Sequence, residues 1–159
     1  MKAITVAKYY LSKDPKKILF NDKIVTLKNN RHAYEGNIRL NKYLFLTQVV
    51  YMAKYGKKLF EDDFLAYENG PIIKEIQQSY GRMTFKDNEQ IPKDIIDFLD
   101  KIYMSLENAT YEELIDITHE DPEWIKLKDK TYNAPTMNLE KNIEEYKKRY
   151  KGLIEALKI

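Results

Sequence analysis

The chain lacks cysteine altogether, and its 159 residues include only two histidines. Without thiols it can form neither disulfides nor thiolate metal sites. His32 and His119 alone could supply imidazole, so a structural zinc site, which takes four Cys or His ligands, is excluded. We therefore predict a protein with no metal and no cofactor.

A strong charge of one sign and long apolar runs are also missing. The 27 basic residues nearly balance the 25 acidic ones, and the net charge of +2 is too small to attract nucleic acid or anionic lipid over the whole surface. No segment approaches the roughly 20 apolar residues that span a bilayer, and the N-terminus has no apolar run of signal-peptide length. We expect a cytoplasmic protein that does not associate with membranes.

What the chain does contain is enough apolar sequence for one core. With 43% hydrophobic residues and no repeat, low-complexity tract or flexible linker, residues 1–159 suit a single domain. The periodicity predicts a mainly α fold, a single compact helical domain of about six to seven helices. A small β-hairpin or meander, residues 18–36, is inserted after the first helix because turn-forming residues there separate short β-type runs.

The helices before residue 82 are predicted from apolar spacing and from breakers. One covers Ala3 to Leu11 and stops at Asp14-Pro15, and a long central one runs from Leu40 to Tyr55 and ends at Gly56 in the left-handed conformation. Residues 64–67 are expected to form a turn or short helix. Asn69-Gly70-Pro71 breaks the chain, and Pro71 is expected to begin a helix that runs to Tyr80.

After a polar loop at residues 82–90, the pattern predicts four more helices. The first begins near Pro92, Thr110 and Glu113 form a capping box, and Asp121 caps a helix that Pro122 begins. The last, 138–159, is amphipathic, and its apolar stripe is narrow and heptad-like. That stripe either closes the core, the interpretation we favour, or forms a homodimer seam.

Several motifs, in this order, carry a family resemblance. They are Ala3 to Leu11, the Leu-Asn-Lys helix from Leu40 to Gln48, Gly-Lys-Lys-Leu-Phe at 56–60, the Ala66-Tyr67 and Gly70-Pro71-Ile72 segment, and Thr118-His119 with Pro122 and Trp124. Together they resemble the Panacea domain, the antitoxin-associated family that includes SocA-like and phage-associated GepA-like proteins. The resemblance implies a mostly helical cytoplasmic domain of bacteria and phages, whose members typically neutralise toxins encoded beside them.

This chain differs from many members in two respects. It has Tyr67 where many carry Trp, and it has the segment 18–36 where many run almost directly into the Leu-Asn-Lys helix. We expect a non-enzymatic antitoxin that binds a cognate toxin or another target protein. The partner-binding candidates are Arg39, Lys42, Tyr67, Asn69 and Trp124, around a turn whose backbone is fixed by Gly70 and Pro71. Lys42 and Trp124 could equally be structural, and the hairpin 18–36 is a second candidate surface.

Other functions stay open at this point. The same scaffold could serve a phage- or mobile-element-encoded inhibitor of a host defence protein. A DNA-binding regulator of its own operon would use the cations of the last helix, but Glu144-Lys148 and Glu145-Arg149 stand at ion-pair spacing, which favours a solvated face. His119, amid Glu113, Glu120 and Asp121, suggests an acid/base or metal cluster, although local capping by these acids is the favoured interpretation.

Overall fold

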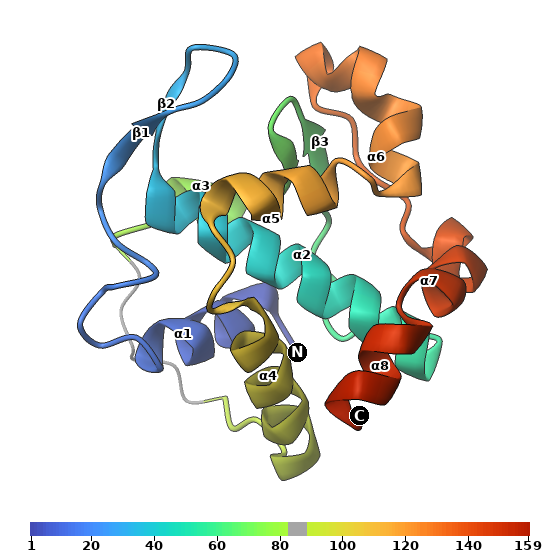
Figure 1. Ribbon diagram of the computed structural model, residues 1–159. Coiled ribbons are helices and arrows are strands. Elements are labelled where there is room, and N and C mark those ends of the chain that lie inside the picture. Colours follow the sequence, from blue (N-terminus) through green and yellow to red (C-terminus); the bar gives the residue numbers. More distant parts are fainter. Residues whose placement is uncertain (83–88) are drawn as a thin grey trace.

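The computed structural model describes residues 1–82 and 89–159. Within these ranges it contains eight α-helices, two 3-10 helices and two antiparallel strand pairs, so the predicted mainly α fold with a hairpin after the first helix is confirmed (Figure 1). The predicted polar loop at residues 82–90 lies largely outside the described residues.

The elements are α1 Ala3–Ser12, β1 Ile24–Thr26, β2 His32–Tyr34, α2 Glu35–Tyr55, β3 Leu65–Tyr67, β4 Gly70–Ile72, α3 Lys74–Ser79, α4 Lys93–Leu106, α5 Tyr111–Thr118, α6 Pro122–Leu127, η1 Lys128–Asn133, η2 Glu140–Asn142, α7 Ile143–Arg149 and α8 Lys151–Leu157.

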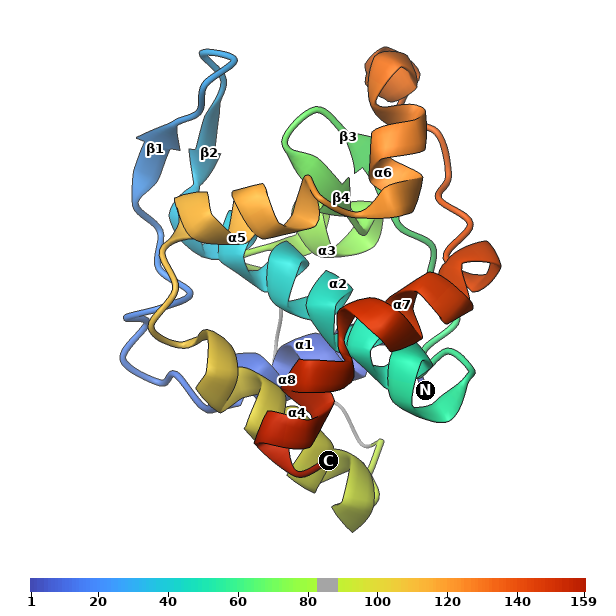
Figure 2. The ribbon, with the colours of Figure 1, turned by 45° about the vertical axis from the view of Figure 1, so that its right-hand side comes forward.

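Helix α2 runs through the middle of the molecule, with α5 and α7 along it and α1 and α4 below (Figure 2). It is buried on every side from Ile38 to Ala53. Gly56 ends it as predicted, with φ of 72° and its N–H donating to the Met52 carbonyl at 2.8 Å. Because a helix buried all round is normally apolar all round, its polar side chains need internal partners.

The polar residues of α2 organise the segments around it. The Gln48 side chain donates to the Phe60 carbonyl at 2.6 Å and accepts from the Leu59 N–H at 2.9 Å, which fixes the chain as it returns along the helix. The side-chain carbonyl of Asn41 accepts from the Ile73 N–H at 2.9 Å. Buried polar groups are retained when they are hydrogen-bonded in this way, so α2 is both the core and the template for its neighbours.

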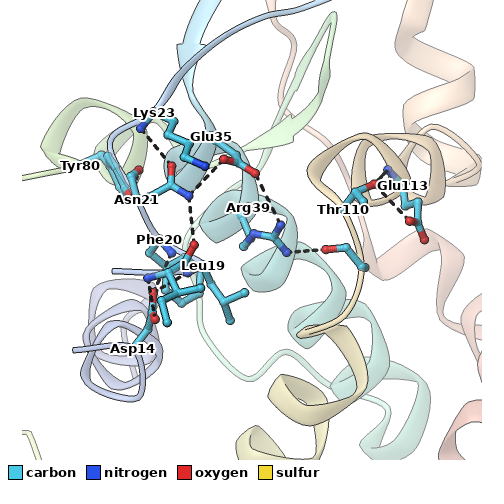
Figure 3. A network of polar contacts seen from close by, with 12 residues as sticks. Asp14, Leu19, Phe20, Asn21, Lys23, Glu35, Arg39, Tyr80, Thr110 and Glu113 are labelled. Carbon is cyan, nitrogen blue, oxygen red and sulfur yellow. Dashed lines mark hydrogen bonds and ion pairs between the residues drawn. The ribbon is translucent and has the colours of Figure 1, made fainter. Parts of the chain in front are cut away.

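In the part of the chain that the structure describes, the first hairpin is a sheet of two strands. β1 and β2 pair antiparallel, with Val25 opposite Ala33. The Ile18–Phe20 run, a candidate strand of the meander, is not one, because its backbone donors are taken by a side chain (Figure 3): the Asp14 carboxylate accepts from the N–H groups of Ile18, Leu19 and Phe20 at 3.0, 2.9 and 2.8 Å.

The base of this hairpin is fixed by a frame of hydrogen bonds (Figure 3). The Asn21 carbonyl accepts from the Gly36 N–H at 3.2 Å and from the Tyr80 hydroxyl at 2.9 Å. The Asn21 side chain donates to the Glu35 carboxylate at 3.1 Å. An added Cβ at Gly36 would collide with the Tyr80 hydroxyl and with the Asn21 backbone. The frame therefore requires glycine there, and it holds the hairpin to the start of α2.

The second hairpin overturns two predictions. Residues 65–67 form a strand rather than a turn or short helix, and Pro71 lies in β4 rather than at the start of a helix, since α3 begins only at Lys74. Pro71 is tolerated in the strand because its partner Ala66 turns its N–H away, toward the Pro135 carbonyl at 2.8 Å. At such a position the missing proline N–H leaves no hydrogen bond unmade.

The predicted caps in the second half are confirmed. Thr110 accepts from the Glu113 N–H at 3.1 Å at the start of α5. Asp121 accepts from the N–H groups of Glu123 and Trp124, both at 3.0 Å, with Pro122 as the first residue of α6. In the described residues, no helix combines the length and apolar character that crossing a membrane needs.

The C-terminal segment 138–159 is not one continuous helix. It is divided into η2, α7 and α8, and the break falls at Tyr150, whose φ of −102° and ψ of 6° leave the helical region. This division accounts for the eighth helix. Leu139 and Tyr146 are buried in the core, and α7 packs on α2. The stripe thus covers the core, while the homodimer seam stays a prediction.

Candidate functional site

The candidate site is built around the second hairpin, where all the predicted residues except Arg39 lie. The Lys42 ammonium of α2 donates to the Pro71 carbonyl at 3.1 Å. The Trp124 indole of α6 donates to the Tyr67 carbonyl at 2.8 Å. Both contacts are made to the hairpin backbone, so these side chains fix the position of the turn.

Gly70 allows the hairpin to approach α2 and α5 closely. Its φ of +108° lies in the region that favours glycine. An added Cβ would lie 2.8 Å from the Thr118 hydroxyl oxygen and 3.0 Å from the Lys42 Cε. Any larger residue would therefore push the turn away from the lysine beneath it.

Arg39 stands apart from this group. Its guanidinium donates to the Ala109 carbonyl at 2.6 Å and lies 3.9 Å from the Glu35 carboxylate, so it joins the base of the first hairpin to the loop before α5 (Figure 3). Of the seven predicted residues, Tyr67 and Asn69 have partly exposed side chains, and the others are buried. Direct contact of these residues with a partner stays a prediction.

Lys42 is unusual because its ammonium is buried next to a neutral group. Its side chain is 2% exposed, and among the described residues its hydrogen-bond acceptor is the Pro71 carbonyl. Burial disfavours the charged form and lowers the pKa of Lys42 to about 7. Near neutral pH the side chain is therefore present in both protonation states.

His119 packs on Trp124, and among the described residues its ring makes no hydrogen bond to the carboxylates of Glu113, Glu120 or Asp121. Its ring stacks on Trp124, with centroids 4.0 Å apart and planes 8° from parallel. Burial, with the nearby Lys42 charge, lowers the pKa of His119. Asp121 caps α6, and the Glu113 carboxylate accepts from the hydroxyl of the α5 cap, Thr110, at 3.2 Å. In the described part of the chain no three His, Asp or Glu residues come together as a metal site would require.

A cavity of about 200 Å³ lies between the two hairpins, beside the first turns of α2. The tips of the hairpins are linked, because the Asn29 amide donates to the Glu68 carboxylate at 3.2 Å. A second cavity, of about 400 Å³, lies between the same tips and α5. We call the two cavities together the hairpin cleft, and the residues common to both are Leu27, Asn29, Glu68 and Asn69.

The sequence predicted each of the two segments that form this cleft, but it did not predict that they lie next to each other. Residues 18–36 and the turn at 67–71 were each candidates for a surface, and the structure brings them together. Asn37, Asn41 and Gln77, which also line the smaller cavity, were not identified. Asn37 and Asn41 are four residues apart, hence on one face of α2, and amides on a helix face that is otherwise apolar were the available signal.

This arrangement defines a helical scaffold that presents a cleft between two hairpins, one buried and one projecting. A model of the family "Antitoxin SocA-like, Panacea domain" matches residues 40–125, and the chain belongs to this family. The match begins within α2 and ends within α6, so it includes the second hairpin and omits the first. No curated protein and no solved structure matches the chain.

Proposed function

We propose that this protein is a cytoplasmic antitoxin that neutralises a cognate toxin by binding it directly, without catalysing a reaction. The observation that carries the proposal is the match of residues 40–125 to the SocA-like Panacea family. The single-domain organisation over 1–159 belongs to the same proposal, and the burial of residues from α1 to α7 in one apolar cluster supports it.

The first hairpin and the cleft beside it are the proposed contact surface. Ile24 is 68% exposed and Tyr34 is 45% exposed, and the two lie opposite each other in the strand pair. Apolar side chains grouped in this way on a projecting element are typical of protein-binding surfaces, and an aromatic residue among them is a suitable anchor. The hairpin lies outside the part that matches the family, which fits a surface that selects the partner.

Binding of operator DNA through the C-terminal helices has less support. Lys147 lies 3.0 Å from Glu144 and Arg149 lies 3.7 Å from Glu145, so these cations are already paired on the surface of α7. Contact with phosphate would have to displace those carboxylates.

Co-expression with the product of the adjacent gene tests the proposal. We expect that product alone to stop growth and this protein to restore it. The double variant Ile24→Asp/Tyr34→Ser should fold normally but lose the rescue, and the purified pair should bind at least tenfold more weakly. Met104→Ser is the matched control, because Met104 is 65% exposed on α4, away from the cleft. An adjacent product without toxicity would remove the antitoxin assignment, and full rescue by the double variant would remove the hairpin surface.

A further inference from the structure

The smaller cavity of the hairpin cleft has apolar walls, among them Leu27, Ile38 and Ile72, and several side chains that can donate hydrogen bonds. Lys42 and Gly70 form one side of it, and the side-chain amides of Asn37, Asn69 and Gln77 are distributed around it. In residues 1–82 and 89–159, the side-chain amides of Asn69 and Gln77 make no hydrogen bond with another protein group; Asn69 is partly exposed and Gln77 is exposed at the edge of the cavity. Such a lining suits a ligand that only accepts hydrogen bonds.

Lys42 supplies the charge at this site. An ammonium group has three donors, and among the described residues one of them is used, on the Pro71 carbonyl. A buried cation next to a neutral acceptor is costly unless an anion compensates it. Gly70 preserves the space at the end of this side chain, because a Cβ there would lie 3.2 Å from the Lys42 Nζ.

The other ionisable groups of the cavity leave this charge uncompensated. Among the described residues that line the cavity, Glu68 alone is acidic, and the Glu68 carboxylate accepts from Asn29 at the exposed tip of the second hairpin. Arg31 and His32 line the side formed by the first hairpin, and Tyr67 lies on β3. His119 follows the end of α5 and lines the larger cavity instead. Lys42 is the buried cation of this lining, whereas Arg31 is exposed. One buried ammonium matches a ligand with a single negative charge, whereas a doubly charged phosphate would need further buried cations.

We infer that the cavity between the two hairpins is a carboxylate-binding site, in which the Lys42 ammonium pairs with the anion and the side chains of Asn69 and Gln77 donate to it. Its volume of about 200 Å³ accommodates a carboxylate with a short carbon chain. The carboxylate can come from an acidic side chain of a protein partner or from a free carboxylic acid. The inference concerns the isolated protein and does not rest on antitoxin activity.

Titration of the purified protein with acetate and with N-acetylglutamate, followed by amide NMR, tests the inference. We expect saturable shifts of the Gly70 and Asn69 amide signals. Lys42→Met keeps the length and packing of the side chain but removes its charge, and it should weaken binding about tenfold or more. Lys54→Met is the matched control on the exposed end of α2 and should bind as the wild type does. Asn69→Ala, at the exposed rim, should weaken binding several-fold and provides a second variant should Lys42→Met fail to fold.

The pH dependence gives a separate readout. Because the pKa of Lys42 is about 7, the ammonium is present at pH 6 and largely neutral at pH 8.5, so acetate should bind roughly tenfold or more weakly at the higher pH. No saturable shift, or equal binding by wild type and Lys42→Met, would overturn the site. Saturation by sulfate without saturation by acetate would overturn the carboxylate assignment.

Competition with the toxin partner identifies the source of the carboxylate. If N-acetylglutamate displaces the partner, an acidic side chain of the partner occupies the site. If it binds equally well to the complex, the natural ligand is a free carboxylic acid. Either result supports the carboxylate site, and failure of both ligands to bind the isolated protein overturns it whether or not the protein is an antitoxin.

Discussion

The two hairpins use the same local structure in opposite ways. Each consists of two strands of three residues in antiparallel register. In the first hairpin the strands are exposed at alternate residues, and Ile24 faces solvent. In the second, the strand Gly70–Ile72 is wholly buried against α2 and α5.

The difference teaches which part of the molecule is scaffold and which is free to face a partner. The second hairpin is held by Lys42, Trp124 and the segment at Pro135, and it lies within the residues that match the family. The first is held at its base and at one contact between tips, and it lies outside them. The second hairpin is therefore both buried and part of the segment that matches the family model. The first hairpin is largely exposed and lies outside that segment.

The largest loss of stability is expected for a substitution at Gly70, in the buried second hairpin. Gly70→Val places a branched side chain at positive φ against the Thr118 hydroxyl and Lys42, and it should lower the free energy of unfolding by about 3 to 4 kcal/mol. Urea denaturation followed by circular dichroism measures it. Gly152→Ala is the control: a Cβ at this exposed position in α8 meets nothing within 4 Å, so the change should be neutral or stabilise by roughly 0.5 kcal/mol. Equal stability of Gly70→Val and wild type would show that the second hairpin is not a fixed element.

A matched pair of isoleucine substitutions compares the hairpins directly. Ile72 is 7% exposed and Ile24 is 68% exposed. Ile72→Ala should cost about 2 to 3 kcal/mol because it leaves a cavity in the core. Ile24→Ala should change the stability by less than about 0.5 kcal/mol. Thermal and urea unfolding of both variants checks this, and comparable losses would break the distinction between scaffold and surface.

The buried lysine beneath the second hairpin should make stability depend on pH. The pKa of Lys42 is about 7 in the folded protein, against an ordinary value of 10.5 for a solvated lysine. Between these values the unfolded chain binds the proton and the folded chain does not, so unfolding takes up a proton and stability rises with pH, by up to about 1.4 kcal/mol per pH unit. Below pH 7 both states bind the proton, and this gain in stability is lost.

Comparison with Lys42→Met isolates the effect. The difference in free energy of unfolding between wild type and Lys42→Met, measured by urea titration at pH 6, 7, 8 and 9, should shift in favour of the wild type above pH 7. Lys54→Met, on the exposed end of the same helix, should follow the wild type at every pH. If the difference in free energy of unfolding between wild type and Lys42→Met is the same at every pH, the Lys42 ammonium of the wild type is solvated, contrary to its burial.

The smallest effect is expected at the contact between the tips. Asn29→Ala removes the 3.2 Å hydrogen bond to Glu68 and should change global stability by less than about 0.5 kcal/mol. Amide hydrogen exchange should nevertheless become faster in β1 and β2 alone. Glu68→Gln retains an acceptor oxygen and should keep the wild-type exchange rates. Unchanged exchange in Asn29→Ala would mean that the frame at the base is enough to order the first hairpin.

Much of the fold was predictable because its signals are local. Gly56, Thr110 and Asp121 end or begin helices through contacts with residues up to four positions away, and their sequence patterns predicted these roles correctly. The strand at β4 was not predictable in this way. Pro71 satisfies a helix-start rule in sequence, but its place in a strand depends on the Pro135 carbonyl, which binds the N–H of its partner.

The site was predictable in composition and not in geometry. The residues that identify the family did converge, since Lys42, Tyr67, Gly70 and Trp124 meet at the second hairpin. Their burial could not be predicted, because it depends on how closely the hairpin approaches α2. Arg39 lies on the same helix as Lys42 but contacts a different loop, at Ala109. The spacing of the two residues in the sequence does not show that one of them contacts the second hairpin and the other does not.

The frame at the base of the first hairpin has a consequence for how such proteins diversify. Because the Asn21 carbonyl receives both the Gly36 N–H and the Tyr80 hydroxyl, the chain enters and leaves the hairpin at almost the same point. A segment closed at its own base behaves as an exchangeable cassette, since a replacement that meets the same two ends loses few other contacts, such as the one between Asn29 and Glu68. Under the proposal that the first hairpin selects the partner, recombination or design between Asn21 and Gly36 is a way to retarget the protein while leaving the helical scaffold unaltered.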